Sequence, residues 1–260
     1  MPYLEIRNMS EEDEYFVGTC SHVGQSDEID SSSRRRMKWI KDMQQYGLRV
    51  KVGLMGGEHV GFLYVMPIEI CPWGPIGRDL MVLPCLYVLK EKEREGVGQG
   101  LLEEAEAETI RQEKKALVTT GHTGESWFMP ASFFEGLGFE IVARKNSAVI
   151  LWKKYDQSAE KPEFLKRSYL YKPEHGKVVI DLFWHSFCGT SDVEAQRVRE
   201  IAAEFADRVV LNEYCADDQE ILYRFQNPRG VFINGKEIGW GYSAPRVGIR
   251  EAIMAALEEI

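Results

Sequence analysis

Short apolar runs alternate with polar and glycine-containing turns over the first 155 residues. The runs have the length and the β-branched or aromatic content of strands, and they cover residues 61–69, 83–89, 116–120, 140–144 and 148–152. An amphipathic helix is predicted after Gly100, and Met37, Ile40 and Met43 mark the apolar side of an earlier one. We therefore expect an α/β (α+β) domain in which helices flank a mixed central sheet.

A second pattern begins after Gly176. Strands are predicted at 177–183 and 208–214, and Asn234-Gly235 is a strong turn signal within a hairpin at 230–239. Helices are predicted between the first two strands and at the end of the chain, where apolar residues recur at helical spacing. These residues are Val198, Ile201, Ala202, Phe205, Ile249, Ile253, Leu257 and Ile260. The predicted order is β-α-β-α-β-β-α, which indicates a smaller, separate α/β domain.

Proline and glycine mark the boundary between the two patterns. The segment 156–176 also holds Phe164, Leu165, Tyr169 and Tyr171, which are too apolar for a free linker. We expect it to lie against one domain or at an interface. The predicted organisation is a domain at 1–155, this connecting segment, and a domain at 177–260.

Charge and composition exclude several classes of protein. The 260 residues carry a net charge of −9, with −6 in residues 1–160 and −3 in residues 161–260, so neither part attracts nucleic acid as a whole. The sequence lacks both a long apolar stretch and a signal peptide, which favours the cytoplasm and no membrane partner. Five scattered cysteines, an odd number, do not suggest a disulfide framework.

A glycine-spaced loop follows the apolar run 83–89. Gly96, Gly98 and Gly100 leave room for backbone N–H groups to converge on an anion, at the positive end of the helix that follows. A nucleotide P-loop does not fit, because Leu101 stands where lysine is required. A dinucleotide site does not fit either, because the next strand does not end in an acidic residue.

The loop resembles the hallmark of the GNAT N-acetyltransferases, Arg/Gln-x-x-Gly-x-Gly/Ala, with Glu93 at the first position and Gly98 at the last. Residues 131–139, Ala-Ser-Phe-Phe-Glu-Gly-Leu-Gly-Phe, are similar to the helix-and-turn signature of the same family. The resemblance covers about residues 3–155 and implies a GNAT sheet that binds acetyl-CoA.

The resemblance also implies which residues hold the acetyl-CoA. Backbone groups of Tyr87 and Val88 should contact the pantetheine arm and the acyl oxygen. The residues expected to surround the pyrophosphate are Arg94, Glu95, Gly96, Val97, Gly98, Gln99 and Gly100. Glu93 departs from the family pattern and should weaken binding by repulsion, which Arg94 or Lys92 can offset.

Catalytic residues are less well defined by the sequence. Glu69 and Asp79 are candidate bases at strand ends, with a solvated cap as the alternative for each, and His122 is either a base or a loop histidine. The family's tyrosine proton donor is replaced by Phe134, and its asparagine by Phe128. The substitute donors are the Tyr87 hydroxyl, His122, Ser126 and a water, and Trp127 is expected in the core or the pantetheine channel wall.

Three consecutive arginines, Arg34 to Arg36, follow three serines at a predicted helix start. They could meet an acidic substrate or the 3′-phosphate of the cofactor. The alternative is a solvated helix start.

The second pattern resembles the thioredoxin and glutaredoxin fold, with Cys188 at the start of its first helix. Ser191 replaces the second cysteine of a Cys-x-x-Cys motif, and Cys215 is a candidate resolving thiol or ligand of a soft metal. In the alternative interpretation, Ser191 and Glu194 form a capping box and Cys188 is a turn residue. No metal site is assigned.

The pairing of the two domains resembles a small prokaryotic group labelled YoaP-like, whose members are mostly assigned as acetyltransferases. We expect an acetyl-CoA-dependent N-acetyltransferase that acts on a small amine, with a homodimer left open. The alternative is a protein that binds coenzyme A or responds to thiols or metals, with little transferase activity.

Overall fold

A computed structural model of the chain describes residues 3–124, 128–240 and 244–260. The chain divides into two compact units. The first comprises Met1–Val23 and Ile40–Leu165, and the second comprises Gly24–Trp39 and Lys166–Ile260. One boundary therefore falls inside helix α2 (Asp27–Gln44), which the sequence pattern places wholly in the first domain.

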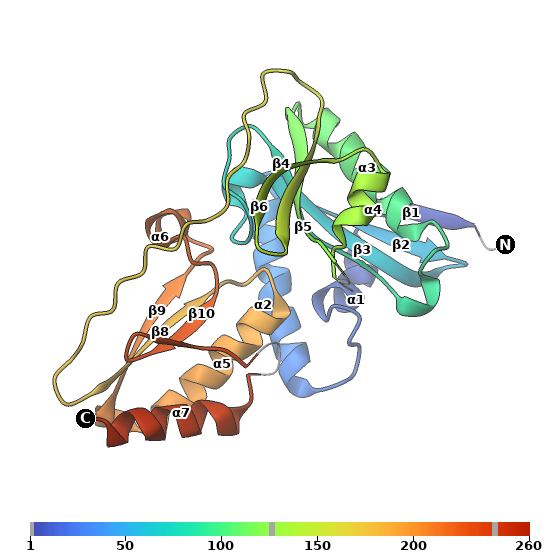
Figure 1. The fold of residues 1–260 in the computed structure, drawn as a ribbon. Coiled ribbons are helices and arrows are strands. Elements are labelled where there is room, and N and C mark those ends of the chain that lie inside the picture. The colour runs from blue at the N-terminus through green and yellow to red at the C-terminus, as the bar shows by residue number, and fades with distance from the viewer. Residues whose placement is uncertain (1–2, 125–127, 241–243) are drawn as a thin grey trace. The chain divides into compact units, whose positions relative to one another are not determined.

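The first unit holds a seven-stranded mixed sheet in the order β1-β2-β3-β4-β5-β7-β6 (Figure 1). Its elements are β1 (Leu4–Asn8), η1 (Glu11–Asp13), α1 (Glu14–Gly18), β2 (Arg49–Met55), β3 (Glu58–Pro67), η2 (Ile68–Ile70), β4 (Met81–Val88), η3 (Lys90–Lys92), α3 (Val97–Arg111), β5 (Ala116–His122), α4 (Ala131–Gly136), β6 (Glu140–Lys145) and β7 (Ala148–Lys154). The strands expected from the apolar runs are all present, and the α/β fold class is confirmed.

Side chains on the two faces of this sheet pack against different helices. Leu63 and Leu83 lie in a core with Leu101 of α3 and Phe134 of α4. On the opposite face, the Phe62 ring contacts the Phe16 ring of α1 at 5.7 Å between centroids. Alternation along a strand sends neighbouring residues to opposite faces, so β3 supplies both layers.

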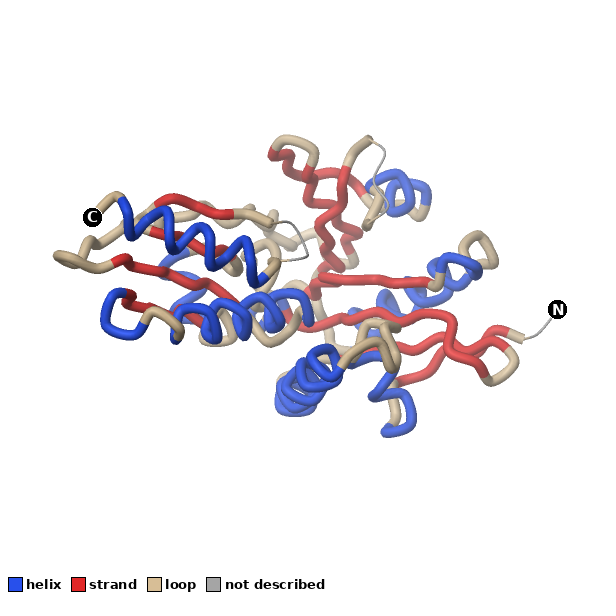
Figure 2. The backbone as a smooth tube through the Cα atoms, turned by 90° about the horizontal axis from the view of Figure 1, so that it is seen from below, coloured by secondary structure: helices blue, strands red, loops and turns tan. Residues whose placement is uncertain are grey.

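The sheet divides at its centre. β4 and β5 are parallel and pair only over Met81–Leu83 and Leu117–Thr119, and Thr119 Oγ1 donates to Leu83 O at 2.8 Å at the last paired position. Beyond this point the strands separate into two arms, as Figure 2 shows. β4 continues to Val88 without β5 beside it.

The second unit holds a four-stranded sheet in the order β11-β10-β8-β9, with β8 parallel to β9 and antiparallel to β10. Its elements are β8 (Val178–Trp184), α5 (Gly189–Ala203), η4 (Ala206–Arg208), β9 (Val209–Cys215), α6 (Gln219–Phe225), β10 (Gly230–Ile233), β11 (Lys236–Ile238) and α7 (Arg246–Glu258). Helices α5 and α7 lie side by side along one face of the sheet (Figure 1). On that face Ile180 and Ile233 pack with Val198 and Ile253.

The first half of α2 belongs to this second unit through buried polar contacts. The Arg36 side chain is only 2% exposed, and its Nε donates to Phe187 O at 2.6 Å. Arg35 forms a bidentate ion pair with Asp192, whose carboxylate is buried. Arg34 to Arg36 therefore do not lie at the start of the helix, which begins at Asp27, and neither Arg35 nor Arg36 is free to bind a phosphate.

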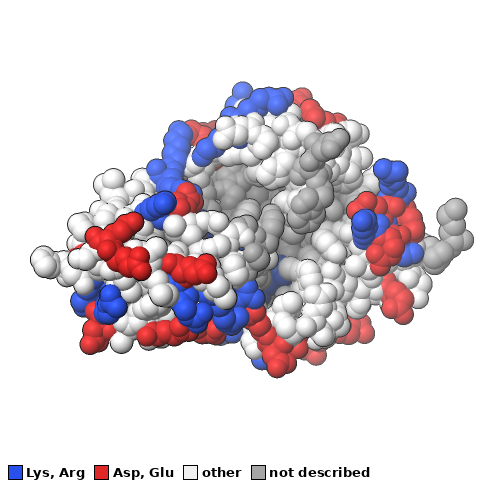
Figure 3. Space-filling view, turned by 60° about the horizontal axis from the view of Figure 1, so that its bottom comes forward, with Lys and Arg blue, Asp and Glu red and all other residues white. Residues whose placement is uncertain are grey.

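Further ion pairs extend this attachment. Glu28 accepts from Arg197 at 2.6 Å and from Arg246 at 3.0 Å, which links α2 to both α5 and α7. Arg246 also pairs with Glu200 at 2.7 Å. Such shared carboxylates make acidic and basic side chains neighbours, and charges of both signs are interspersed on the face seen in Figure 3.

None of the helices in the described ranges is long and apolar enough to cross a bilayer.

The attachment of α2 predicts that a fragment beginning at residue 156 is unstable. It lacks the partners of Asp192 and Arg197, and breaking a buried ion pair costs about 3–5 kcal/mol. We expect a midpoint of thermal unfolding well below that of the second unit in the full chain, measured by circular dichroism. A synthetic peptide of residues 24–44 should raise the midpoint, whereas the same peptide with Arg35→Ala and Arg36→Ala should not. If the fragment alone, without peptide, unfolds at the same midpoint as the second unit of the full chain, α2 does not have this role.

Candidate functional site

The candidate site lies where β4 loses its neighbour. From Pro84 to Val88 one edge of β4 has no strand beside it in the described structure. A strand edge without a partner presents backbone N–H and C=O groups that can pair with an extended chain. This edge can therefore bind a linear molecule that contains amide groups.

The glycine loop follows directly from this end of β4. The backbone of Arg94 (φ +65°) and of Gly96 (φ +85°) is left-handed, and Gly96 is the N-cap of α3. The first hydrogen bond of the helix runs from Gly100 N to Gly96 O at 3.0 Å. The N–H groups ahead of Gly100 lack helical acceptors, and the helix dipole adds positive potential there, so this turn can bind an anion.

The three glycines serve different purposes, which corrects the expectation that all three open space for a ligand. A Cβ at Gly96 would meet no atom within 4 Å. A Cβ at Gly100 would lie 2.6 Å from Ile6 Cδ1, and one at Gly98 would lie 3.3 Å from the Phe133 ring. Gly100 therefore allows α3 to pack closely on β1, and Gly98 allows α4 to approach the start of α3.

The charges around this loop are mixed. Glu93 and Arg94 are exposed, and Lys92 pairs with Glu95 at 3.6 Å. Gln99 Nε2 donates to Glu103 Oε1 at 2.9 Å. Exposed pairs of this kind contribute little to stability, so they can rearrange when an anion binds.

Tyr87 and Val88 lie at the free end of β4, close to the start of α3. The Tyr87 ring packs against the Phe62 ring at 5.5 Å, on the face away from α3. Val88 Cγ2 lies 3.8 Å from the Cβ position of Gly98. Tyr87 O comes within 2.6 Å of the Cβ position of Gly61, so any larger residue at 61 would push β3 and β4 apart.

His122 ends β5 and is half-buried. Because β4 and β5 are parallel, His122 lies at the same end of the sheet as Tyr87 and Val88. The backbone N–H of His122 donates to Met129 O at 2.9 Å, and the His122 ring lies 6.3 Å from the Phe128 ring. The structure thus brings His122 to the divergent end of the two strands.

Glu69 and Asp79 lie at the opposite end of β4. Asp79 N donates to Glu69 Oε1 at 2.7 Å, and Lys114 and Lys115 pair with the two carboxylates at 3.7 and 3.4 Å. β4 has eight residues, so at about 3.3 Å per residue its ends are roughly 23 Å apart. The geometry does not support Glu69 or Asp79 as the base, and both stay predictions.

Phe134 is a core residue with 1% exposure. Its ring contacts those of Phe133 and Phe139. A core phenyl ring cannot replace the tyrosine donor, and Phe128 supplies no polar side-chain atom. Ser126 and Trp127 lie outside the described residues.

In the second unit, Cys188 is the N-cap of α5, which begins at Gly189. The capping-box interpretation is wrong, because Ser191 Oγ accepts from His185 N and Glu194 pairs with Arg229. The Cys188 Sγ atom lies 3.1 Å from Thr190 Oγ1.

His185 fixes the backbone of Cys188. Cys188 N donates to His185 Nδ1 at 3.3 Å, so the proton of a neutral imidazole is on Nε2. Burial lowers the pKa of His185 to about 3, aided by Arg229 and Arg36. His185 is therefore neutral at physiological pH and keeps this acceptor role.

Cys215 is poorly suited to act as a resolving thiol. Burial, and next the charge of Asp217, raise the pKa of Cys215 to about 12. The thiolate that attacks a disulfide is therefore scarce at neutral pH. Within the described residues, no three His, Cys, Asp or Glu side chains gather where they could hold a metal ion.

Comparison with known proteins gives no match to a protein-family model and none to a curated protein. Solved structures resemble part of the chain. A protein from Desulfovibrio desulfuricans described as a GNAT-family acetyltransferase is 15% identical, with 58% of this chain and 99% of that chain covered at a TM-score of 0.46. The PaiA N-acetyltransferase of Thermoplasma acidophilum, in complex with coenzyme A, is 22% identical, with 59% and 99% covered at a TM-score of 0.42.

A third structure, the ribosomal-protein-alanine N-acetyltransferase of Brucella melitensis, is 19% identical, with 58% and 99% covered at a TM-score of 0.43.

The cysteine environments predict selective alkylation. Burial raises the pKa of Cys71 and of Cys215 to about 12, so at pH 8 both thiols are almost wholly protonated, and the Cys71 thiol is also shielded from solvent. In the native protein iodoacetamide should leave Cys71 unmodified and should react with half-exposed Cys215 more slowly than with half-exposed Cys188, as measured by peptide mass spectrometry. In urea all three should be modified. Equal rates for Cys71 in native and unfolded protein, or for Cys215 and Cys188 in native protein, would contradict these environments.

Proposed function

We propose that the first unit is an acetyl-CoA-dependent N-acetyltransferase of the GNAT type, which acetylates the primary amine of a small molecule. The proposal rests on one observation: the unpaired edge of β4 beyond Leu83 and the N-terminus of α3 behind Gly96 lie at the same end of the sheet. An open edge suits an amide-containing arm, and a helix N-terminus suits a pyrophosphate. Coenzyme A carries both groups.

In this proposal the pyrophosphate is bound by the backbone of residues 94–100. Gly96 supplies the left-handed turn and the open space in front of it, and Arg94 supplies a positive charge. Glu93 is the unfavourable neighbour, because its carboxylate repels the phosphates. The pantetheine arm then extends along Tyr87 and Val88.

The chemical step is the attack of an amine on the thioester. The amine nitrogen forms a bond to the acyl carbon, the carbonyl oxygen becomes an oxyanion, and collapse breaks the C–S bond and releases the thiolate. Free N–H groups of β4 would stabilise the oxyanion. His122 would take the proton from the amine, and the Tyr87 hydroxyl or a water would protonate the thiolate.

For the second unit we propose a thioredoxin-like domain. The β-α-β-α-β-β-α order, the sheet order β11-β10-β8-β9 and the position of Cys188 at the start of α5 support it. Because Cys215 is largely protonated, it would resolve a mixed disulfide of Cys188 poorly, which favours sensing or a structural role over disulfide turnover.

A second candidate function is coenzyme A binding with little transfer. The burial of Phe134 favours it, because the position of the usual proton donor holds a core side chain.

Two substitutions should move coenzyme A affinity in opposite directions. Gln99→Glu adds a carboxylate in the first turn of α3, where it favours the helix but repels phosphate, and should raise the Kd about tenfold. Glu93→Gln removes a repulsion and should lower the Kd about threefold. Both values come from isothermal titration calorimetry with coenzyme A. Glu113→Gln, beyond the other end of α3, is the control and should leave the Kd unchanged. If all three variants bind as the wild type does, the pyrophosphate does not lie at this helix.

Turnover separates the two candidate functions. Release of free thiol from acetyl-CoA is measured across a panel of primary amines, and His122→Gln should lower kcat about 100-fold with little change in the Kd for acetyl-CoA. His175→Gln, at an exposed histidine of the second unit, is the control. Binding without turnover on any amine would favour the second candidate, and absence of binding would refute both.

A further inference from the structure

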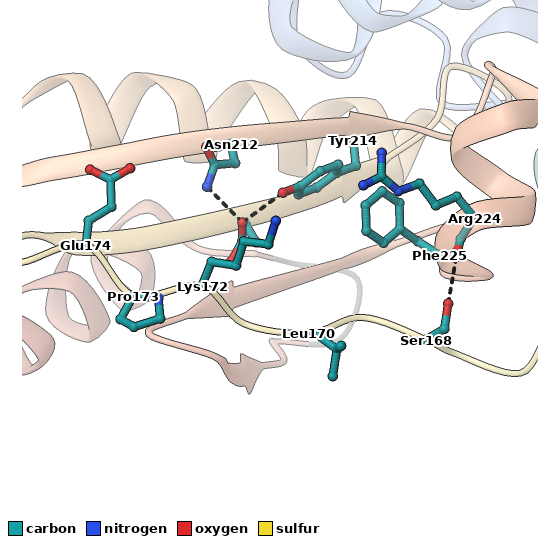
Figure 4. A pocket seen from close by; sticks show the side chains of 10 residues that line it. Ser168, Leu170, Lys172, Pro173, Glu174, Asn212, Tyr214, Arg224 and Phe225 are labelled. Carbon is teal, nitrogen blue, oxygen red and sulfur yellow. Dashed lines mark hydrogen bonds between the residues drawn. The ribbon is translucent and has the colours of Figure 1, made fainter.

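The second unit contains a cavity that lies apart from α5 and α7. Its volume is about 530 Å³, and it is lined by residues of β8, of β9, of the end of α6 and of the extended segment 168–174 (Figure 4). Alternation along β8 and β9 places Asp181, Asn212 and Tyr214 on this face of the sheet, because Ile180, Leu182 and Leu211 pack toward the helices. A cavity of this size can hold a small organic molecule.

A buried carboxylate lies in the wall of this cavity. Asp181 is 3% exposed, and its Oδ2 accepts from the Tyr169 hydroxyl at 2.5 Å. Its Oδ1 accepts from Asn212 Nδ2 at 3.0 Å and from the Tyr214 hydroxyl at 3.4 Å, and the dashed lines in Figure 4 show these two donors converging.

The donors around Asp181 are all neutral. Burial, and next the hydrogen bond to Asp181, raise the pKa of Tyr169, so its phenol stays protonated and donates. Within the described residues Asp181 forms no ion pair. A buried carboxylate without a counter-charge is costly unless further partners are supplied, and an ammonium group would supply one.

Two positive charges line the same cavity, together with the exposed carboxylate of Glu174. Lys172 lies on the extended segment, and Arg224 lies on α6 with its guanidinium 5.0 Å from the centre of the Phe225 ring. Neither forms an ion pair within the described part of the chain. Arginines on α5 and α7 are engaged in ion pairs instead. Those that each pair with a carboxylate are Arg197, Arg199, Arg246 and Arg250.

We propose that this cavity binds a free α-amino acid. Its ammonium group would approach Asp181, its carboxylate would pair with Lys172 or Arg224, and its side chain would contact the rings of Tyr214 and Phe225. A lone amine would leave the two cations unused, and a lone carboxylate would leave Asp181 without a counter-charge. The proposal does not rest on acetyl transfer by the first unit.

The test is binding to the full-length protein of each common L-amino acid, tried singly by thermal shift and then by isothermal titration calorimetry. n-Butylamine and butyrate are the probes that carry only one of the two charges. At least one amino acid should bind, and it should bind at least about tenfold more tightly than either probe.

Variants locate the site. Asp181→Asn and Arg224→Gln should each weaken binding of that amino acid about tenfold. Arg208→Gln removes the same charge from an exposed position outside the cavity lining and should leave the affinity unchanged. Because Arg224 is exposed, its variant tests the proposal even if Asp181→Asn does not fold, which circular dichroism reports.

Three outcomes would overturn the proposal. No amino acid binds the wild type, or the amino acid binds both variants as well as the wild type, or n-butylamine or butyrate binds as tightly as the amino acid. Titration with coenzyme A is run on the same variants and should give the wild-type Kd. A failure of this proposal is thereby distinguished from a failure of the coenzyme A site.

Discussion

The early end of the pairing between β4 and β5 is the constraint on which the candidate site depends. Two parallel strands that stop pairing leave backbone donors and acceptors unused on both, and the chain has to satisfy them in some way. On β5 this is done within the protein, because His122 N donates to Met129 O. On β4 the edge from Pro84 to Val88 lies open, and the next turn of chain places the start of α3 at its end. The unpaired backbone groups of β4 and the free N–H groups at the start of α3 are thus adjacent, and neither depends on a specialised side chain.

The candidate site therefore consists mainly of backbone N–H and C=O groups. The side chains around it are ordinary: a valine in contact range of a glycine, a tyrosine packed on a phenylalanine, and charges on the surface. Of the residues predicted to act in catalysis, His122 and Tyr87 lie at the end of the sheet where β4 and β5 diverge, and Glu69 lies at the other end.

Features set by neighbouring residues could be predicted from the sequence. The helix that follows the glycine loop, the hairpin at Asn234-Gly235 and the strand pattern depend on local backbone preferences, and the structure has all three. Contacts between distant segments could not be predicted in this way. Arg36 reads as a surface residue beside two other arginines, yet it is buried because Phe187 O, 151 residues away in the chain, accepts its hydrogen bond. Likewise Ser191 and Glu194 fit a capping box, but His185 and Arg229 compete for their side chains. Asp181 has one local signal in the sequence, since it is a charged residue within an otherwise apolar strand.

The division of α2 between the two units has a consequence for synthesis on the ribosome. Arg35 and Asp192 are 157 residues apart in the chain, so at roughly 5–20 residues per second the arginine waits on the order of ten seconds for its partner to be made. During that time the apolar and charged groups on the first half of α2 have nothing of their own unit to bind. The second unit can therefore be completed only after nearly the whole chain has emerged, and an interruption in translation would leave an early helix exposed to chaperones or to other nascent chains.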